Sequence, residues 1–458
     1  MWVSTSDASA SSTRSKGKDV SVEMDSLHNQ PVSLSLNVRG LGQSATLAIK
    51  DRCRALRRQG RNVYDFGLGQ SPFPVPRSVV EALRTSAAEK DYLPVRGLPA
   101  LREAVADFHR NLDHVETHSD RVIVGPGSKE LMFLLQLVFY GEILIPTPCW
   151  VSHLPQARIV GRPVTLIPTS LENQWKLTPE QLVRTVEVVN DDHRPRLLIL
   201  NSPSNPTSVA YTSDELQAIA EVARRFRIIV MSDEIYGQLH HTGDHVSIAQ
   251  FYPEATIISS GLAKWRGAGG WRLGTFVFPT NLGWLADVMT AVASETYTSL
   301  CAPIQYAAVV AFQENKEIDA YLRHARRILA ALGNRSVAIL REAGAAVQPG
   351  DGAYYLFPDF SPLRDPLAKR GIYDDVALCR RLLDETGTAI LPGSAFARLR
   401  SELTARLSLV DFNGAEALSA SEALGLNKPL PADFVDRLCP NSIQGMKAIA
   451  AWLHASEM

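Results

Sequence analysis

A lysine set among small residues is the part of the sequence best suited to covalent chemistry. Residues 259–274 read SSGLAKWRGAGGWRLG, with Lys264 as the only lysine and Arg272 eight positions further on. The small neighbours leave room for a bulky planar group on the lysine amine, and the glycines let the backbone approach that group closely. Arg272 is a cation that suits a phosphate or a carboxylate. The stretch therefore predicts a lysine that carries a flat group, with an anion held nearby.

A carboxylate is expected at the end of an apolar strand. Asp233 follows the expected strand 228–232 and opens the sequence Asp-Glu-Ile-Tyr, which ends at Tyr236. A carboxylate in that place is partly removed from water and needs a cationic partner. A protonated ring nitrogen could be that partner. The alternative is an aspartate that caps the first turn of a helix.

Two turns follow expected strands and could hold a ligand. Residues 125–130 read GPGSKE, and a glycine turn that opens a helix offers free N–H groups and a favourable dipole to a phosphate. An ordinary helix cap is the other interpretation. Residues 201–207 read NSPSNPT and follow the expected strand 196–200. In α/β folds, ligands bind at such carboxyl ends of strands.

Strands and helices alternate between residues 122 and 278, which predicts a mostly parallel sheet with helices on both faces. The apolar run 131–145 is interpreted as a buried helix followed by a strand, because it is too short to span a bilayer. A helical region at 302–340, broken near 314–318, is expected to lead into a smaller domain. Strands of that domain are expected at 345–348, 353–357 and 406–410.

Composition excludes several classes of protein. The chain has 458 residues, 45% of them hydrophobic, and a formal charge of −1. It therefore lacks the excess of basic residues that would attract nucleic acid or an anionic membrane. Its five cysteines are scattered and form no C-x-x-C pair, which argues against a disulfide framework or a zinc site and for a reducing, cytoplasmic location. Residues 1–38 are rich in Ser, Thr and Lys and are expected to form a disordered tail.

Taken in order, these motifs resemble those of the class I/II aminotransferases, enzymes of fold type I that depend on pyridoxal 5'-phosphate (PLP), and they are nearest to the aspartate- and tyrosine-type members. The resemblance covers about residues 41–410. It implies that Lys264 is the Schiff-base residue and that Asp233 pairs with the pyridine nitrogen. It also implies that Asn205 and Tyr236 lie on the side of the phenolate oxygen. The phosphate would be held by Gly127, Ser128, Lys129, Ser259 and Arg272.

The assignment of Ser259 to the phosphate departs from the usual family pattern. The family often has a serine three positions before the lysine, but Gly261 stands there in this chain. The missing phosphate hydroxyl is therefore expected from Ser259. Lys129 carries a second expectation, because in similar aspartate-type members the matching lysine helps to hold a dicarboxylate side chain. It would favour aspartate or glutamate as substrate.

Four further roles come from the resemblance. Trp150 would stack on the pyridine ring, although a tryptophan buried in the core is the alternative. Tyr92 would reach across a dimer interface to the cofactor phosphate. Gly69, in the proline-rich loop 62–76, would lie beside the substrate, whereas a plain hinge is the other interpretation of that loop. Arg406 would grip the substrate α-carboxylate through two parallel hydrogen bonds.

The resemblance implies an α/β fold with a mostly parallel seven-stranded sheet sandwiched by helices, plus a smaller α+β domain. The implied activity is ping-pong transfer of an amino group from an L-amino acid to a 2-oxo acid through pyridoxamine phosphate, in a homodimer. The alternative is another PLP reaction on the same fold: elimination, decarboxylation or oxidation. Residues 411–440 depart from the compact family ending. The expected regions are a tail (1–38), an N-terminal arm (39–75), a large PLP-binding domain (76–303) and a C-terminal small domain (304–458).

Overall fold

The computed structural model describes residues 35–455, apart from residues 190 and 192. Before Leu41 the described residues contain one 3-10 turn, Leu36–Val38. Almost all of the expected tail, 1–38, lies outside the described residues. Residues 41–458 group into one compact unit, and the account below concerns that unit.

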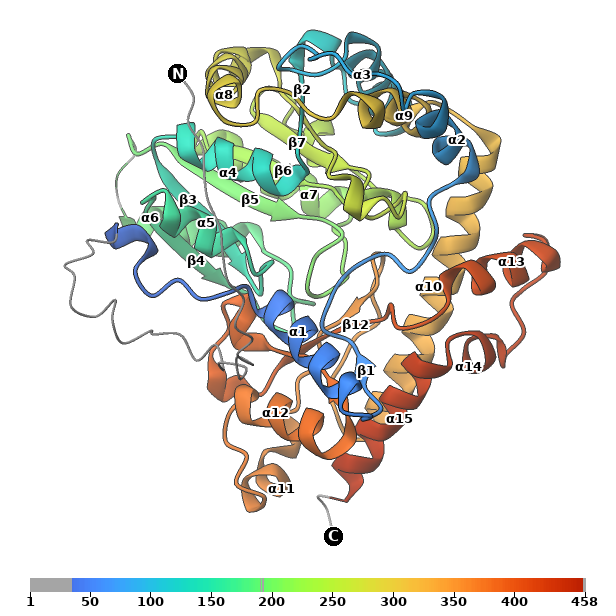
Figure 1. The fold of residues 1–458 in the computed structure, drawn as a ribbon. Coiled ribbons are helices and arrows are strands. Elements are labelled where there is room, and N and C mark those ends of the chain that lie inside the picture. The colour runs from blue at the N-terminus through green and yellow to red at the C-terminus, as the bar shows by residue number, and fades with distance from the viewer. Residues whose placement is uncertain (1–34, 190, 192, 456–458) are drawn as a thin grey trace, which may run out of the picture. The chain divides into compact units, whose positions relative to one another are not determined.

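The larger sheet has seven strands in the order β2-β8-β7-β6-β5-β3-β4 (Figure 1). Strand β8 runs antiparallel to both of its neighbours, and the remaining neighbours pair in parallel. The mostly parallel sheet predicted from the sequence is therefore confirmed. Its strands are β2 (Val122–Gly125), β3 (Glu142–Thr147), β4 (Val164–Pro168), β5 (Arg196–Asn201), β6 (Ile229–Asp233), β7 (Thr256–Gly261) and β8 (Gly274–Val277).

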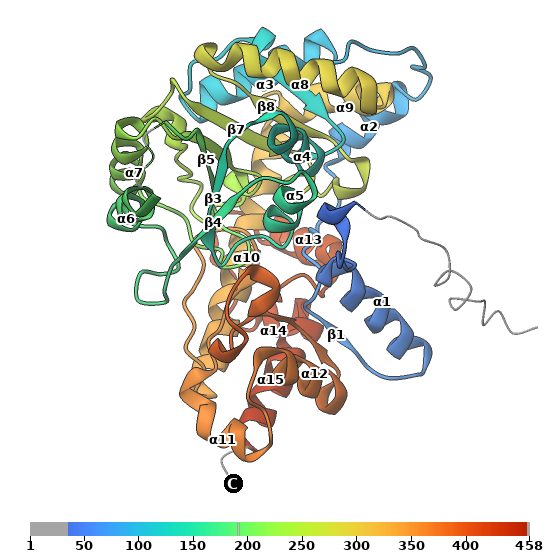
Figure 2. The same cartoon turned by 90° about the vertical axis from the view of Figure 1, so that its left-hand side faces the viewer.

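Helices cover both faces of this sheet (Figure 2). Successive strand residues point to opposite faces, so Ile143 and Ile145 of β3 join one core cluster while Leu144 joins another. The first face is covered by α4 (Ser128–Val138), α5 (His153–Ile159) and α8 (Gly283–Thr296). The second is covered by α6 (Pro179–Val189) and α7 (Ser213–Arg225). Since both faces are buried, the strands carry nearly continuous apolar runs.

The long helical region at 302–340 is broken as expected. It forms α9 (Ala302–Phe312) and α10 (Lys316–Glu342), and Asn315 between them caps α10 by accepting a hydrogen bond from the backbone of Glu317. Helix α9 packs against two earlier helices, α2 (Arg77–Thr85) and α3 (Pro99–Leu112). Among the helices of the described residues, none combines the length and the hydrophobicity that a membrane span requires.

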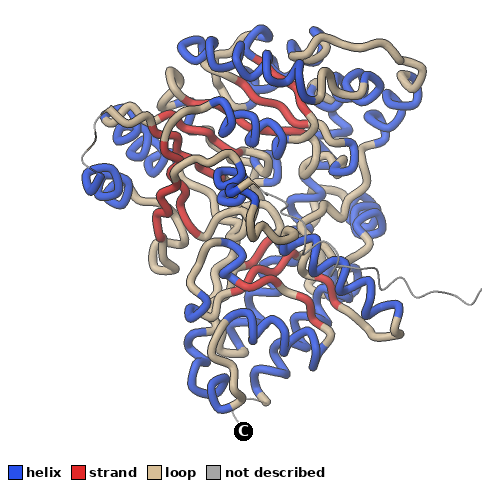
Figure 3. The backbone as a smooth tube through the Cα atoms, turned by 60° about the vertical axis from the view of Figure 1, so that its left-hand side comes forward, coloured by secondary structure: helices blue, strands red, loops and turns tan. Residues whose placement is uncertain are grey.

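A second group of strands lies among the C-terminal helices (Figure 3). One sheet has the order β11-β12-β9, and a two-stranded sheet joins β1, from the N-terminal part of the unit, to β10. The strands are β1 (Tyr64–Asp65), β9 (Tyr355–Leu356), β10 (Thr388–Ala389), β11 (Leu391–Pro392) and β12 (Ala405–Ser408). The helices around them are α1 (Ala45–Arg58), α11 (Arg364–Lys369), α12 (Asp375–Thr386), α13 (Gly414–Leu424), α14 (Phe434–Leu438) and α15 (Pro440–His454).

The predicted strand at 345–348 was wrong. Only Ala346 pairs, in an isolated antiparallel bridge with Asp359. The chain reaches Pro349 directly afterwards, and a proline has no N–H to extend a ladder. The segment 411–440, which departs from the compact family ending, contains α13, capped by Asn413, and α14.

Candidate active site

A cavity of about 120 Å³ opens at the carboxyl ends of β5 and β6, beside the first turn of α4. This is the edge of a parallel sheet where α/β proteins bind ligands. The cavity is lined by Gly127, Ser128, Lys129, Trp150, Asn201, Asn205, Asp233, Ile235, Tyr236, Ala263, Lys264, Arg272 and Leu273. The structure therefore brings together residues from turns that are far apart in the sequence.

Lys264 enters this cavity from the loop that follows β7. Its Nζ donates a hydrogen bond of 2.6 Å to the carbonyl oxygen of Gly69 and lies 5.5 Å from the ring centre of Tyr236. Burial, together with the charge of Arg406, lowers the pKa of the amine to about 8, although Asp233 acts in the opposite direction. A neutral lysine amine is a nucleophile, so the surroundings of Lys264 favour the reactive form.

Asp233 ends β6 and is 3% exposed. In the described part of the chain, the one side-chain hydrogen bond to this carboxylate comes from Ser259 Oγ, at 3.3 Å. Burial raises the pKa of Asp233 to about 7, against the opposing effects of the Ile235 backbone, Ser259 and Lys264. A buried carboxylate with so little compensation fits a cationic group bound beside it.

Ser259 does not stand where we expected it. It is fully buried, pairs with Asp233 across β6 and β7, and donates its hydroxyl to that carboxylate. It does not line the cavity. Strand register explains the contact, because it sets Ser259 level with Asp233 in the sheet. The expected phosphate contact is replaced by a contact that positions Asp233.

The turn before α4 has the geometry of an anion site. Gly127 is the N-cap residue with φ of +87°, and a Cβ there would lie 2.4 Å from Arg272 Nη2. Gly274 of β8 packs so closely against the turn that a Cβ would lie 2.1 Å from the backbone nitrogen of Ser128. The free N–H groups of α4 and the guanidinium of Arg272 therefore face one small space.

Arg406 on β12 lies 1% exposed, beside Asn205. Its Nη1 donates to Asn205 Oδ1 at 3.2 Å, its Nη2 donates to the carbonyl oxygen of Gly67, and its Nε has no partner. Burial lowers the pKa of the guanidinium. No carboxylate of the described residues forms an ion pair with it, so an incoming carboxylate would meet an unmatched buried cation.

Three tyrosines form a cluster beside the lysine, of which the sequence analysis identified one. The hydroxyl groups of Tyr236 and Tyr355 are 2.6 Å apart, and Tyr354 packs edge-on against Tyr236. The guanidinium carbon of Arg406 lies over the ring of Tyr355, 4.9 Å from the ring centre. The signal for the missed pair was the Tyr-Tyr that follows Gly352-Ala353, where an expected strand meets the site.

Trp150 and Lys129 lie at the wall of the cavity. The ammonium of Lys129 is 5.3 Å from the ring centre of Trp150, and burial together with the charge of Arg272 lowers the pKa of Lys129. Trp150 is partly exposed, so it is not the fully buried tryptophan of the alternative interpretation. Gly69 reaches the site through its carbonyl oxygen. Tyr92 is 89% exposed and does not line the cavity of its own chain.

Comparison with known proteins identifies the family. The family model described as Aminotransferase class I and II matches residues 61–412. The chain is a class I and II aminotransferase. This aminotransferase is 31% identical to the aspartate aminotransferase of Bacillus sp. (strain YM-2), over 82% of this chain and 96% of that protein. It is also 31% identical to the aspartate/prephenate aminotransferase of Thermus thermophilus, over 80% of this chain and 91% of that protein.

Solved structures agree with this family. The Thermus thermophilus aspartate aminotransferase with maleate superposes with a TM-score of 0.77 at 28% identity, over 92% of this chain and 99% of that one. The aminotransferase described here therefore has the fold type I architecture and uses PLP as its cofactor. The residues present fit that group: an amine for its aldehyde, a buried carboxylate for its ring nitrogen, and a helix N-terminus with an arginine for its phosphate.

Proposed function

We propose that this aminotransferase prefers dicarboxylic L-amino acids, aspartate or glutamate, and that Lys129 holds the side-chain carboxylate. The supporting observation is the position of Lys129. Its ammonium lies at the cavity wall, 5.3 Å from the ring centre of Trp150, and the charge of Arg272 helps to lower its pKa. No carboxylate of the described residues pairs with it. Two relatives that are 31% and 33% identical to this chain are named aspartate aminotransferases. One similar solved structure contains maleate, which is a dicarboxylate.

The proposed roles of the other residues follow from their contacts. Bound PLP supplies an aldehyde and an electron-withdrawing ring that acidifies the Cα–H of the amino acid. With PLP bound, the Lys264 amine would be the base that moves a proton away from the Cα atom of the amino acid. Asp233, held by Ser259, keeps the ring nitrogen protonated.

Arg406 and Asn205 orient the substrate. The guanidinium of Arg406 binds the α-carboxylate, for which its unpartnered Nε and its planar fork are suited. Asn205 accepts from Arg406 through its oxygen, which leaves the amide nitrogen as a donor to the phenol oxygen of the cofactor. Tyr236 supports that side of the site from beneath Lys264.

The proposal includes a homodimer in the cytoplasm. Tyr92 is highly exposed and precedes α3, so a second copy could receive it at the phosphate of its own site. All five cysteines are free, as suits a reducing compartment. The division into an arm (39–75), a large domain (76–303) and a small domain (304–458) is also proposed, with support from the pairing of β1 with β10.

The test compares Lys129→Met with wild type on L-aspartate and on L-alanine. A lost charge-assisted hydrogen bond is worth about 1.5–3 kcal/mol, so kcat/KM for aspartate should fall about 10- to 100-fold while the value for alanine stays within about twofold. Lys90→Met, at an exposed lysine outside the site, is the matched control and should change neither value. An equal loss for both amino acids in Lys129→Met would refute the proposed preference.

A further inference from the structure

Glu234 is a buried carboxylate that stands among active-site residues but faces away from the site. Asp233, Ile235 and Tyr236 all line the active-site cavity, whereas Glu234 does not. Adjacent residues of an extended strand point to opposite sides, which explains why Asp233 and Glu234 separate at the end of β6. The side chain of Glu234 is 3% exposed, so its charge needs partners inside the protein.

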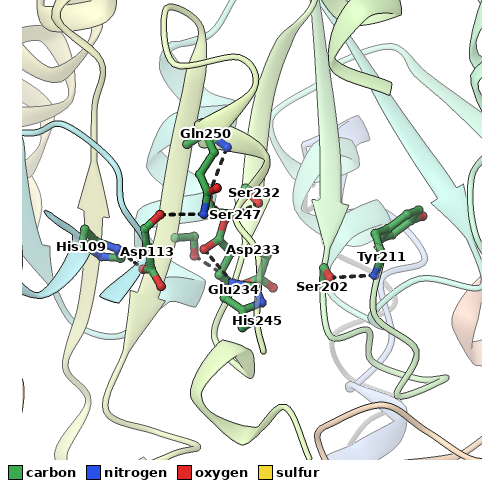
Figure 4. A network of polar contacts seen from close by, with 12 residues as sticks. His109, Asp113, Ser202, Tyr211, Ser232, Asp233, Glu234, His245, Ser247 and Gln250 are labelled. Carbon is green, nitrogen blue, oxygen red and sulfur yellow. Dashed lines mark hydrogen bonds and ion pairs between the residues drawn. The ribbon is translucent and has the colours of Figure 1, made fainter. Parts of the chain in front are cut away.

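Three side chains of the described residues contact the carboxylate of Glu234 (Figure 4). Its Oε1 accepts a hydrogen bond from Ser232 Oγ at 2.7 Å and another from Ser247 Oγ at 2.6 Å. Its Oε2 lies 3.0 Å from Nε2 of His245, whose side chain is 5% exposed. The two hydroxyl groups are neutral, so His245 is the member of this set that can supply a positive charge.

The surroundings of His245 favour its protonated form. Burial lowers the pKa of His245, but the hydrogen bond and charge of Glu234 and the charge of Asp113 outweigh burial, and the pKa lies above its ordinary value of about 6.5. The opposing positive groups are Arg326 and His240, and burial lowers the pKa of His240 itself. Below the pKa of His245, the contact is therefore between an imidazolium and a carboxylate.

This pair is part of the turn that carries Tyr236. The backbone N–H of Gly237 donates to the carbonyl oxygen of Glu234 at 2.8 Å, which closes the turn after β6. The ring of His245 packs so closely against the turn that a Cβ on Gly237 would lie 2.7 Å from its Cδ2 atom. Tyr236 directly precedes Gly237 and lines the active-site cavity. A shift of the pair would therefore move Tyr236 together with Asp233.

The pair also acts on Asp233 through its charges. After burial, which has the largest effect, the negative charge of Glu234 is among the influences that raise the pKa of Asp233. A protonated His245 beside Glu234 opposes that influence. Compared with an unpaired Glu234, the pair therefore favours the carboxylate form of Asp233, which is the form that can hold a protonated ring nitrogen.

We propose that Glu234 and His245 form a buried ion pair that positions Asp233 for the cofactor, with His245 as an imidazolium. Neither side chain lines the active-site cavity, so both are positioning residues. The proposal does not depend on which amino acid the enzyme transaminates.

The test removes the two charges singly and together and measures cofactor affinity. Pyridoxamine 5'-phosphate is titrated into the cofactor-free enzyme by calorimetry, because it has the ring nitrogen and phosphate of PLP but forms no bond to Lys264. In His245→Gln an amide can still donate to Glu234, but the carboxylate loses its cation. Removing one partner of a buried ion pair is strongly destabilising, so the Kd should rise about tenfold or more. In Glu234→Gln/His245→Gln neither charge remains, and the Kd should return to within about threefold of wild type.

His109→Gln is the matched control. His109 lies 2.6 Å from Asp113 in a second buried histidine–carboxylate pair, and neither residue lines the active-site cavity. The same exchange there should leave the Kd within about twofold of wild type, because the site is not in contact with it. An equal rise in His109→Gln, an unchanged Kd in His245→Gln, or a double variant as weak as His245→Gln would each overturn the proposal. The last result would assign His245 to packing alone.

The pH dependence tests the imidazolium even if His245→Gln does not fold. As pH rises through the pKa of His245, wild type loses the imidazolium and Glu234 is left without a cation, whereas the double variant has neither group to titrate. The wild-type Kd divided by that of the double variant should therefore increase about threefold or more between about pH 6 and about pH 9. A ratio that stays constant over this range would refute the proposal.

Discussion

Lys264 Nζ and the carbonyl oxygen of Gly69 are joined by a 2.6 Å hydrogen bond between segments 195 positions apart in the sequence. The same carbonyl accepts a hydrogen bond from Tyr354 Oη at 3.3 Å. The proline-rich loop therefore sets the position of the lysine amine and of the tyrosine cluster together. The position of this loop depends on the close packing around Gly69.

Gly69→Ala should impair catalysis. A Cβ at this position would lie 2.1 Å from Tyr355 Oη, so the loop must move away from Lys264. We expect kcat/KM to fall about tenfold or more, since overpacking costs about 1–3 kcal/mol. Gly270→Ala, in the lysine segment but with open space around it, is the control and should be nearly silent. Steady-state kinetics with both variants checks this, and equal activity of the two would count against it.

Asp233→Asn should lower the activity of the enzyme but raise the stability of its cofactor-free form. Activity should be largely lost, because a neutral amide cannot keep the ring nitrogen protonated. The folded pKa of Asp233, about 7, is above the unfolded value of about 4, so the native state binds the proton more tightly and this residue's contribution to stability falls as pH rises from about 4 to 7.

Cofactor-free Asp233→Asn should therefore melt at a higher temperature than cofactor-free wild type at pH 8, and the gap should narrow at pH 5. Thermal melts at the two pH values measure it. Ser259→Ala, which removes one hydrogen bond that favours the ionised carboxylate, is the companion variant and should raise the pKa of Asp233 further. A gap that is the same at both pH values would contradict the assignment.

The pKa of Lys264 predicts the pH dependence of cofactor loading. With a pKa of about 8, the neutral amine becomes about tenfold scarcer for each unit below that pH and is the main form above it. The rate at which cofactor-free enzyme takes up PLP, followed by absorbance, should rise with pH and level off near 8. Arg406→Gln removes a nearby cation and should move the plateau to higher pH. A plateau near the ordinary lysine pKa in wild type would refute the prediction.

Arg406→Lys should lower kcat/KM for every amino-acid substrate to a similar degree. Lysine keeps the charge but loses the planar fork that can hold a carboxylate by two parallel bonds. We expect kcat/KM to fall about 10- to 100-fold for aspartate and for alanine alike, by the loss of about 1.5–3 kcal/mol. This uniform loss would distinguish Arg406 from Lys129. A loss confined to aspartate would instead assign Arg406 to the side chain.

The sequence was sufficient for the large sheet because its strands are regular. Alternation in runs such as Ile143-Leu144-Ile145 places residues on two buried faces. Four of the strands end at a glycine, asparagine or aspartate: Gly125, Asn201, Asp233 and Gly261. The site residues on those turns therefore converge by topology alone. The C-terminal sheets were harder, since β9 spans only Tyr355–Leu356 and local pattern has little to act on over two residues.

The contact between Ser259 and Asp233 could not be read from the sequence. The position of Ser259 depends on the register of β7 against β6, which one strand's pattern does not specify.

The bond between Asn205 and Arg406 also bears on how products leave. The oxygen of Asn205 and Nη1 of Arg406 satisfy each other, so this hydrogen bond of two buried polar groups does not depend on a ligand. Departure of an oxo acid therefore leaves neither atom without a partner. Such a site can bind a carboxylate tightly and still release it.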